Sequence, residues 1–282
     1  MGPNLFRYAT TELSQDAFIC WLLAWADKQW AWQDEGLNML GLALVNMMLE
    51  MDGRPPVAVP VSVTVHRQLM RADIVAEVGD DIVILIEDKV NAGLNGDQLV
   101  RYRKRMADKF KGKHMVLVFL KTGDQSSYDE VTKAGYHLVL RQEVLQMLRS
   151  GKDRVSNSIY PDFLDNLEGR EARVESYATS PVSVWTAEWD PWIGFYKRLQ
   201  RDLSDGVQWD YVPNASGGFL GAWWHFKAWK DPITEIEHDV YVQIEQGPIV
   251  LQDRSQSARG GQGSATRSLA HTVNRSGTCD GS

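Results

Sequence analysis

The chain has 282 residues, of which 44% are hydrophobic and 24% are charged, and its formal net charge is −7. This composition is typical of a globular protein with one large domain, or with a core domain and a smaller one. The acidic balance is not the overall signature of a nucleic-acid-binding protein, so such a role would have to come from a local cluster of basic residues. The two cysteines, Cys20 and Cys279, exclude a disulfide framework and a cysteine-based metal site.

Two apolar segments near the N-terminus predict helices over residues 12–30 and 35–51. The longest apolar run, residues 17–26, is too short to cross a membrane. The residues before it lack the basic start of a signal peptide. We therefore expect a cytoplasmic protein without a membrane partner.

Two strand-like segments, residues 72–78 and 81–87, are separated by a Gly-Asp-Asp turn signal. In an antiparallel hairpin, Asp73 near the start of the first strand lies beside Glu87 at the end of the second. Glu87 and Lys89 are two residues apart and project from the same face. Two carboxylates and an ammonium at one end of a sheet suit a divalent cation that activates water against a phosphodiester. The alternative, an ordinary charged sheet edge, fits this spacing equally well.

The next segment, from residue 97, has a helical pattern in which Gln98 and Tyr102 share one face. It is also strongly basic, and its cations are Arg101, Arg103, Lys104, Arg105, Lys109, Lys111 and Lys113. Such a helix can follow a phosphate backbone, and we expect Arg101 and Arg105, which share a face, to bind nucleic acid. The alternative for this cluster is a solvated helix surface.

The remaining pattern up to residue 150 completes an α/β domain. A strand is expected at residues 61–68, before the hairpin, and the strand at 114–120 is continuously apolar, as a strand covered on both faces should be. A loop at 122–135 leads to a strand at 136–140 and a short helix at 142–149.

The series Asp73, Glu-x-Lys at 87–89 and Gln-x-x-x-Tyr at 98–102 resembles the PD-(D/E)XK nuclease superfamily, in a RecB-like variant. Residues 11–25 also resemble the first helix of a bacterial branch of that superfamily, and the resemblance covers about residues 4–150. The proline of the family name is absent, because Arg71 and Ala72 precede Asp73. The resemblance implies a restriction-endonuclease-like αβββαβ core, with a mixed sheet flanked by helices.

The resemblance also implies a metal cofactor, Mg²⁺ or Mn²⁺. It assigns Asp73, Glu87 and the backbone carbonyl of Asp88 as ligands. Glu12 resembles an acidic residue on the first helix of related nucleases, where it would bind or support the metal. A favourable acid in the first turn of a helix is an equally good explanation of Glu12. Lys89 would act on the attacking water and on the charge of the transition state.

The resemblance gives Gln98 and Tyr102 the task of positioning Lys89, the water or the phosphate. The chemistry would be that of a metal-dependent nuclease, with DNA as the expected substrate. The alternative is a catalytically silent protein of the same fold that binds nucleic acid or a partner in a defence or repair system. The joint presence of Asp73, Glu87 and Lys89 favours catalysis, because a binding module has no need of all three.

Residues 151–251 predict an accessory α+β region, in which helices precede an antiparallel sheet. Seven of the eleven tryptophans fall between residues 185 and 229. Their rings could stack on bases, but packing in a small core is the favoured explanation. Residues 252–282 lack aromatic side chains and are rich in Ser, Gly and Arg, so we expect a disordered tail or the product of a frameshift. We thus place domain boundaries at 150 and 251.

Overall fold

The computed structural model describes residues 3–57, 61–94, 96–185, 188–203, 206–213, 218–246, 249–256 and 265–269. Within it the chain divides into two compact units, Met1–Ala172 and Arg173–Ser282. The expected boundary at 150 falls inside the first unit. In the described part of the chain, every helix is too short or too polar to cross a bilayer.

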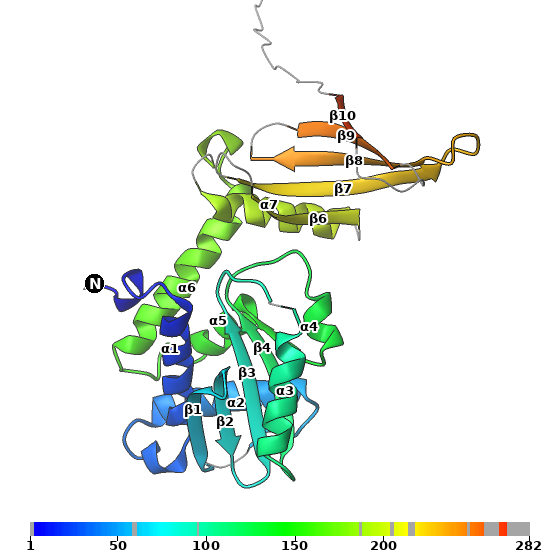
Figure 1. Cartoon of the computed structure of the whole chain (residues 1–282). Coiled ribbons are helices and arrows are strands. Elements are labelled where there is room, and N and C mark those ends of the chain that lie inside the picture. Colours follow the sequence, from blue (N-terminus) through cyan, green and yellow to red (C-terminus); the bar gives the residue numbers. More distant parts are fainter. Residues whose placement is uncertain are drawn as a thin grey trace, which may run out of the picture. The chain divides into compact units, whose positions relative to one another are not determined.

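A mixed five-stranded sheet forms the centre of the first unit (Figure 1). Its strands lie in chain order and are β1 (Val63–Leu69), β2 (Ala72–Val78), β3 (Ile82–Lys89), β4 (His114–Lys121) and β5 (His137–Leu140). The first three pair antiparallel, whereas β3, β4 and β5 pair parallel. The α/β class and the mixed sheet of a restriction-endonuclease-like core are confirmed.

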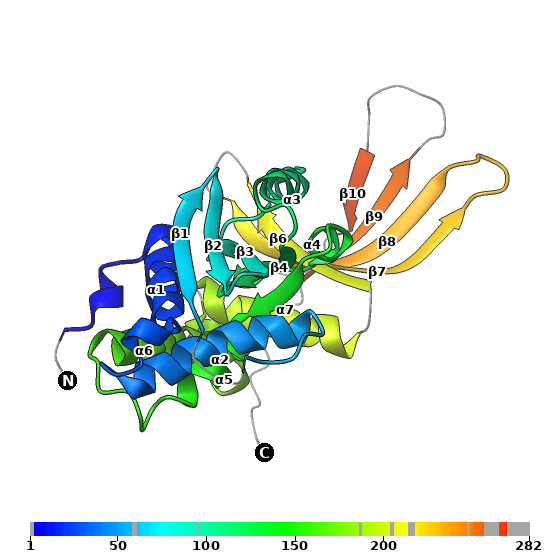
Figure 2. The ribbon, with the colours of Figure 1, turned by 90° about the horizontal axis from the view of Figure 1, so that it is seen from below.

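Helices cover both faces of this sheet, as Figure 2 shows. Figure 2 shows α3 (Gln98–Lys109) on one side of the sheet. The helices on the other side are α1 (Glu12–Trp25), α2 (Glu35–Met51) and α5 (Arg141–Arg149). Strand β3 therefore reads as a continuous apolar run, with Ile84 and Ile86 in the core under α1 and α2 and Leu85 in the core under α3.

The first helix is shorter than its sequence predicts. It ends at Trp25, and residues Lys28–Trp30 form the separate 3₁₀-helix η2, so the expectation of one helix over residues 12–30 is wrong. Asp27 is the cause, because its carboxylate accepts hydrogen bonds from the amides of Gln29 (2.8 Å) and Val63 (2.7 Å). The aspartate thus caps η2 and ties the turn to β1.

The loop expected at residues 122–135 contains a short helix, α4 (Asp129–Lys133), which buries Val131 against the α3 side of the sheet. Helix α6 (Ile159–Glu175) is the last long element of the first unit, and the short η1 (Leu5–Arg7) lies near the N-terminus. Phe163 of α6 stacks on Phe18 of α1, with ring centroids 3.7 Å apart. This packing explains why the first compact unit extends beyond residue 150.

The second unit holds a five-stranded antiparallel meander. Its helical elements are η3 (Ser176–Ala178), η4 (Val182–Val184) and α7 (Trp189–Asp202). Its strands are β6 (Val207–Val212), β7 (Phe219–Lys230), β8 (Glu237–Glu245), β9 (Ile249–Gln256) and β10 (Ala265–Leu269). Residues 252–256 and 265–269 of the expected tail are thus strand, while 257–264 and 270–282 lie outside the described residues.

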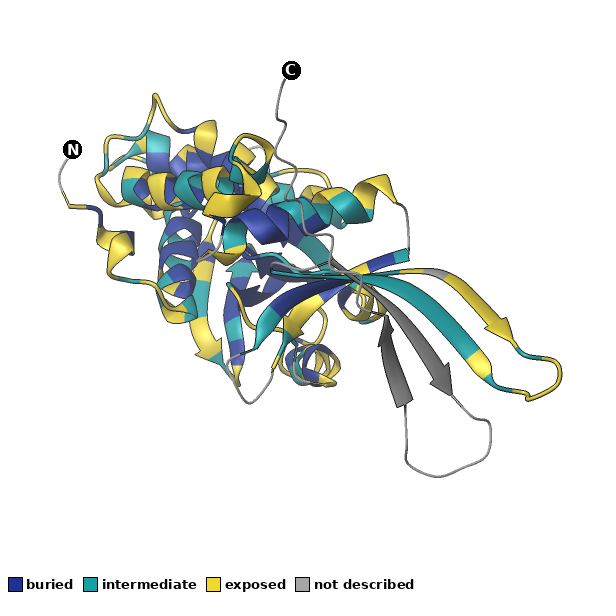
Figure 3. Cartoon of the chain, turned by 90° about the horizontal axis from the view of Figure 1, so that it is seen from above, coloured by how far each residue is buried: buried dark blue, intermediate teal, exposed yellow. Residues whose placement is uncertain are grey.

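Three of the clustered tryptophans form the core of the second unit. Trp185, Trp192 and Trp209 are at most 5% exposed and pack around the fully buried Tyr196. Trp189 and Trp229 are 47% and 42% exposed, and Figure 3 shows that the far end of the β7–β8 hairpin is largely exposed. Core packing therefore accounts for these three rings and not for the whole cluster.

Candidate active site

The hairpin register brings the predicted acidic residues to one end of the sheet. Ile74 of β2 faces Ile86 of β3, so Asp73, one residue before Ile74, lies across from Glu87, one residue after Ile86. Both side chains belong to the α3 face, because each alternates with a residue buried on the α1 face. Lys89 follows on the same face of β3.

The three side chains make direct contacts. Lys89 Nζ lies 2.5 Å from Glu87 Oε1 and 3.4 Å from Asp73 Oδ2. The backbone of Asp88 also contacts these side chains, since its N–H donates to Asp73 Oδ2 at 3.0 Å and its carbonyl accepts from Lys89 Nζ at 3.0 Å. The structure therefore unites Asp73, Glu87, Lys89 and the backbone of Asp88 in one cluster.

Helix α3 places the glutamine and the tyrosine beside this cluster. Gln98 is the first residue of α3, and its amide donates to Glu87 Oε1 at 2.5 Å and to the Tyr102 hydroxyl at 3.3 Å. One oxygen of Glu87 thus faces two donors, Lys89 and Gln98. Its other oxygen, Oε2, is buried and has no hydrogen-bond partner in the described part of the chain.

The electrostatics of the cluster favour a cation. Burial and the neighbouring Asp73 raise the pKa of Glu87 to about 7, although Lys89 opposes them. Burial lowers the pKa of Lys89, but Glu87 and Asp73 outweigh it and raise this pKa above its ordinary value. Lys89 is consequently an ammonium near neutral pH, while an added positive charge would help Glu87 to ionise.

The donor set fits a hard divalent cation. The buried Oε2 of Glu87, the carboxylate of Asp73 and the carbonyl of Asp88 are oxygen donors at one place. The described residues contain no group of three or more His, Cys, Asp or Glu side chains that could hold a metal. Two carboxylates suffice for Mg²⁺, which keeps several of its waters.

Glu12 contacts the segment that follows strand β3. Its Oε1 accepts from the amides of Val90 (3.0 Å) and Ala92 (3.3 Å). The contact holds the backbone just after Lys89. A metal-binding role of Glu12 stays a prediction.

Two buried polar residues beside the cluster escaped the sequence analysis. Lys121, at the end of β4, pairs in register with Lys89, is 1% exposed and donates to the carbonyl of Ala92 at 2.7 Å. Burial lowers the pKa of Lys121 to about 8. Gln15 of α1 contacts Asp88 at 2.6 Å. In the sequence, Lys121 is marked by its charge directly after an apolar run. Gln15 is marked only by its position one turn after Glu12.

The basic residues of α3 lie mostly on its exposed side. Arg101 forms an ion pair with Asp97 one turn earlier, and the guanidinium of Arg105 lies 5.9 Å from the centre of the Tyr102 ring. Arg101 and Arg105 therefore flank the face that carries Gln98 and Tyr102.

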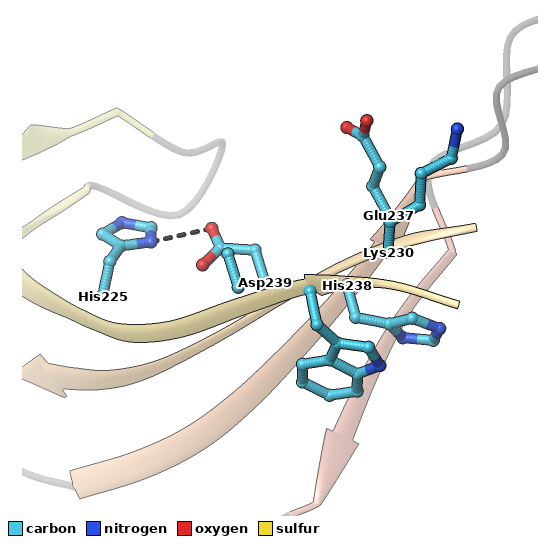
Figure 4. Close-up of a pocket in the computed structure, with 7 residues that line it drawn as sticks. His225, Lys230, Glu237, His238 and Asp239 are labelled. Carbon is cyan, nitrogen blue, oxygen red and sulfur yellow. Dashed lines mark hydrogen bonds and ion pairs between the residues drawn. The ribbon is translucent and has the colours of Figure 1, made fainter. Parts of the chain in front are cut away.

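A separate pocket of about 580 Å³ lies at the far end of β7 and β8 in the second unit (Figure 4). His225 contacts Asp239 there at 2.8 Å, and the rings of Trp229 and His238 stack with centroids 4.8 Å apart. Its charged side chains are one lysine and two carboxylates, Glu237 and Asp239. This balance of charges does not favour phosphate.

Comparison with known proteins bears on the first unit. Residues 61–176 match the family model of the PD-(D/E)XK nuclease superfamily. No curated protein and no solved structure matches the chain. The matched segment carries the whole cluster from Asp73 to Tyr102, whereas Glu12 and Gln15 lie before it. Together with the mixed sheet and the Asp73–Glu87–Lys89 cluster, this match shows that the chain carries, over residues 61–176, a domain of the PD-(D/E)XK nuclease superfamily.

Proposed function

We propose that the protein is a nuclease that hydrolyses phosphodiester bonds of DNA with Mg²⁺ or Mn²⁺ as cofactor. The observation that carries the proposal is the buried Oε2 of Glu87, which has no hydrogen-bond partner in the described structure and lies on a carboxylate in contact with Lys89. A buried carboxylate oxygen without a partner is costly, and a divalent cation would satisfy it.

In this proposal Asp73, Glu87 and the carbonyl of Asp88 hold the cation. The bound cation would polarise a phosphate oxygen and acidify a bound water. Lys89 remains an ammonium, so it orients the attacking water and offsets the negative charge that develops on the phosphate. Gln98 holds Oε1 of Glu87 and leaves Oε2 for the cation, while Tyr102 supports Gln98.

The test is incubation of the purified protein with end-labelled DNA and RNA, as single strands, duplexes and branched forms, with Mg²⁺ or with a chelator. We expect Mg²⁺-dependent cleavage of DNA. Lys89→Met should reduce the cleavage rate by about 100- to 1,000-fold, the cost of losing one preorganised donor, while thermal stability and DNA binding are largely retained. Asp73→Ala should abolish cleavage.

Lys152→Ala is the matched control for Lys89, because Lys152 is exposed and lies outside the cluster. It should cleave like the wild type. Cleavage that persists in Asp73→Ala, or in the presence of the chelator, would contradict the proposed mechanism. Metal binding without cleavage of any substrate would instead support the silent nuclease fold.

A further inference from the structure

A buried glutamine on α1 cross-links the candidate metal site from behind. Gln15 is 6% exposed, and its Nε2 donates to Asp88 Oδ1 at 2.6 Å and to the carbonyl of Lys89 at 3.4 Å. Its Oε1 accepts from the Thr122 hydroxyl at 2.5 Å. One side chain thus connects α1, the catalytic strand β3 and the residue directly after β4.

The Asp88 side chain points away from the cluster, but its peptide belongs to it. Asp88 is 1% exposed and projects toward α1, on the opposite face of β3 from Glu87 and Lys89. Its N–H orients Asp73, and its carbonyl contacts Lys89 Nζ and is the proposed backbone ligand. The N–H and the carbonyl belong to the peptide groups before and after the Asp88 Cα, so a shift of the Asp88 backbone would disturb both contacts.

We infer that Gln15 is a positioning residue of the metal site, which fixes the Asp88 backbone through the Asp88 carboxylate. The inference rests on the proposed function, because it assumes that Asp73 and the Asp88 carbonyl bind the cation. Groups that orient metal ligands from outside the coordination sphere typically contribute a factor of about 10 to 100 to metal affinity.

A purely structural role for Gln15 predicts a different result. A cross-link between α1 and β3 would stabilise the fold without changing the affinity of a folded protein for metal. The contacts of Asp88 argue for more, because the residue that Gln15 holds by its side chain contacts Asp73 through its N–H and Lys89 through its carbonyl.

The experiment is calorimetric titration of the full chain with Mn²⁺ and Mg²⁺, together with thermal unfolding without metal. Gln15→Met keeps the side-chain length but removes the donor and the acceptor. We expect its metal affinity to fall about 10- to 100-fold. Gln146→Met on α5, an exposed glutamine, is the matched control and should bind metal like the wild type.

A double-mutant cycle tests the route of the effect. If Gln15 acts through Asp88, the effects of Gln15→Met and Asp88→Asn on metal affinity are not additive. The double variant then binds metal little more weakly than the single variant with the lower affinity. Additive losses would overturn the inference. If Gln15→Met does not fold, Gln15→Asn retains an amide that is too short to span the same contacts, and we expect the same direction of change.

The outcomes separate the two proposals. A folded Gln15→Met with wild-type metal affinity overturns the inference alone, whether or not its unfolding temperature falls. A wild type that binds neither Mn²⁺ nor Mg²⁺ overturns the proposed function as well.

Discussion

At the residue scale, the two oxygens of Glu87 differ in their surroundings. Oε1 contacts Lys89 and Gln98, whereas Oε2 is buried without a hydrogen-bond partner in the described structure. Burial and Asp73 raise the pKa of this carboxyl to about 7 from its ordinary value of 4.5. The folded protein therefore binds the Glu87 proton more tightly than the unfolded chain does.

The sign of the resulting pH dependence follows from linkage. The contribution of protonated Glu87 to stability is fully present below its unfolded pKa and is lost as the pH rises through about 7. Without metal, we expect the wild type to be less stable at pH 8 than Glu87→Gln, and the difference between the two to shrink toward pH 5. Thermal unfolding of both proteins in the presence of a chelator across this pH range measures the difference in stability.

Glu130→Gln is the control, because Glu130 is exposed and lies outside the cluster. Addition of Mg²⁺ at pH 8 should raise the unfolding temperature of the wild type and leave that of Glu87→Gln unchanged, since ligand binding to the folded state stabilises it. Parallel pH profiles for the wild type and Glu87→Gln would show that Glu87 does not hold a proton in the folded protein.

At the scale of elements, α3 carries two sets of polar side chains on adjacent faces. Gln98 and Leu99 begin the helix with buried side chains, and Tyr102 follows one turn after Gln98. Arg101, which is exposed, and Arg105, which is half-buried, lie next to that face, and an exposed ion pair such as Arg101–Asp97 contributes little to stability. We propose that these two cations bind a phosphate backbone that passes over the cluster.

The basic face of α3 predicts a salt effect on DNA binding. In the Lys89→Met background, in which cleavage should be greatly slowed, Arg101→Ala with Arg105→Ala should weaken binding. Each lost phosphate contact should flatten the slope of log affinity against log salt by about 0.7 to 0.9. Fluorescence anisotropy with labelled DNA over a range of salt concentrations measures the slope.

Arg149→Ala with Arg154→Ala is the matched control, because both arginines are exposed and Arg149 also forms an ion pair, with Glu168. These two substitutions should leave the slope of log affinity against log salt unchanged from that of the Lys89→Met protein. An equal slope after loss of Arg101 and Arg105 would identify α3 as a solvated surface.

At the scale of the whole molecule, the site belongs to one of the two units. The residues proposed to form or support it lie between Glu12 and Thr122, and the first compact unit extends to Ala172. We therefore expect a chain of residues 1–176, which retains α6, to unfold cooperatively and to bind Mg²⁺ with the affinity of the full chain. Calorimetric titration of both proteins compares the affinities.

The Asp73→Ala change in the shortened chain is the control and should remove metal binding. A folded fragment with weaker metal binding would mean that the second unit, Arg173–Ser282, contributes to the site. The second unit would then be more than the accessory region expected for residues 151–251.

The local pattern of the sequence predicted the strands of the first sheet and the meeting of Asp73, Glu87 and Lys89. Alternation and a turn signal are properties of neighbouring residues, and an antiparallel hairpin converts them directly into a register. The local pattern failed to predict the end of α1 at Trp25, because the cause is a hydrogen bond that the Val63 N–H donates to Asp27 from 36 residues away in the chain.

What the sequence by itself determined is therefore the superfamily resemblance, the mixed sheet and the carboxylates with their lysine. The tertiary structure alone decided what surrounds them. Gln15 reaches Asp88 and Thr122 across 73 and 107 residues of sequence, and Lys121 lies beside Lys89 only because β4 pairs with β3. The burial of Glu87 Oε2 without a hydrogen-bond partner among the described residues also depends on this packing, since burial and hydrogen bonding are properties of the folded chain and not of local spacing.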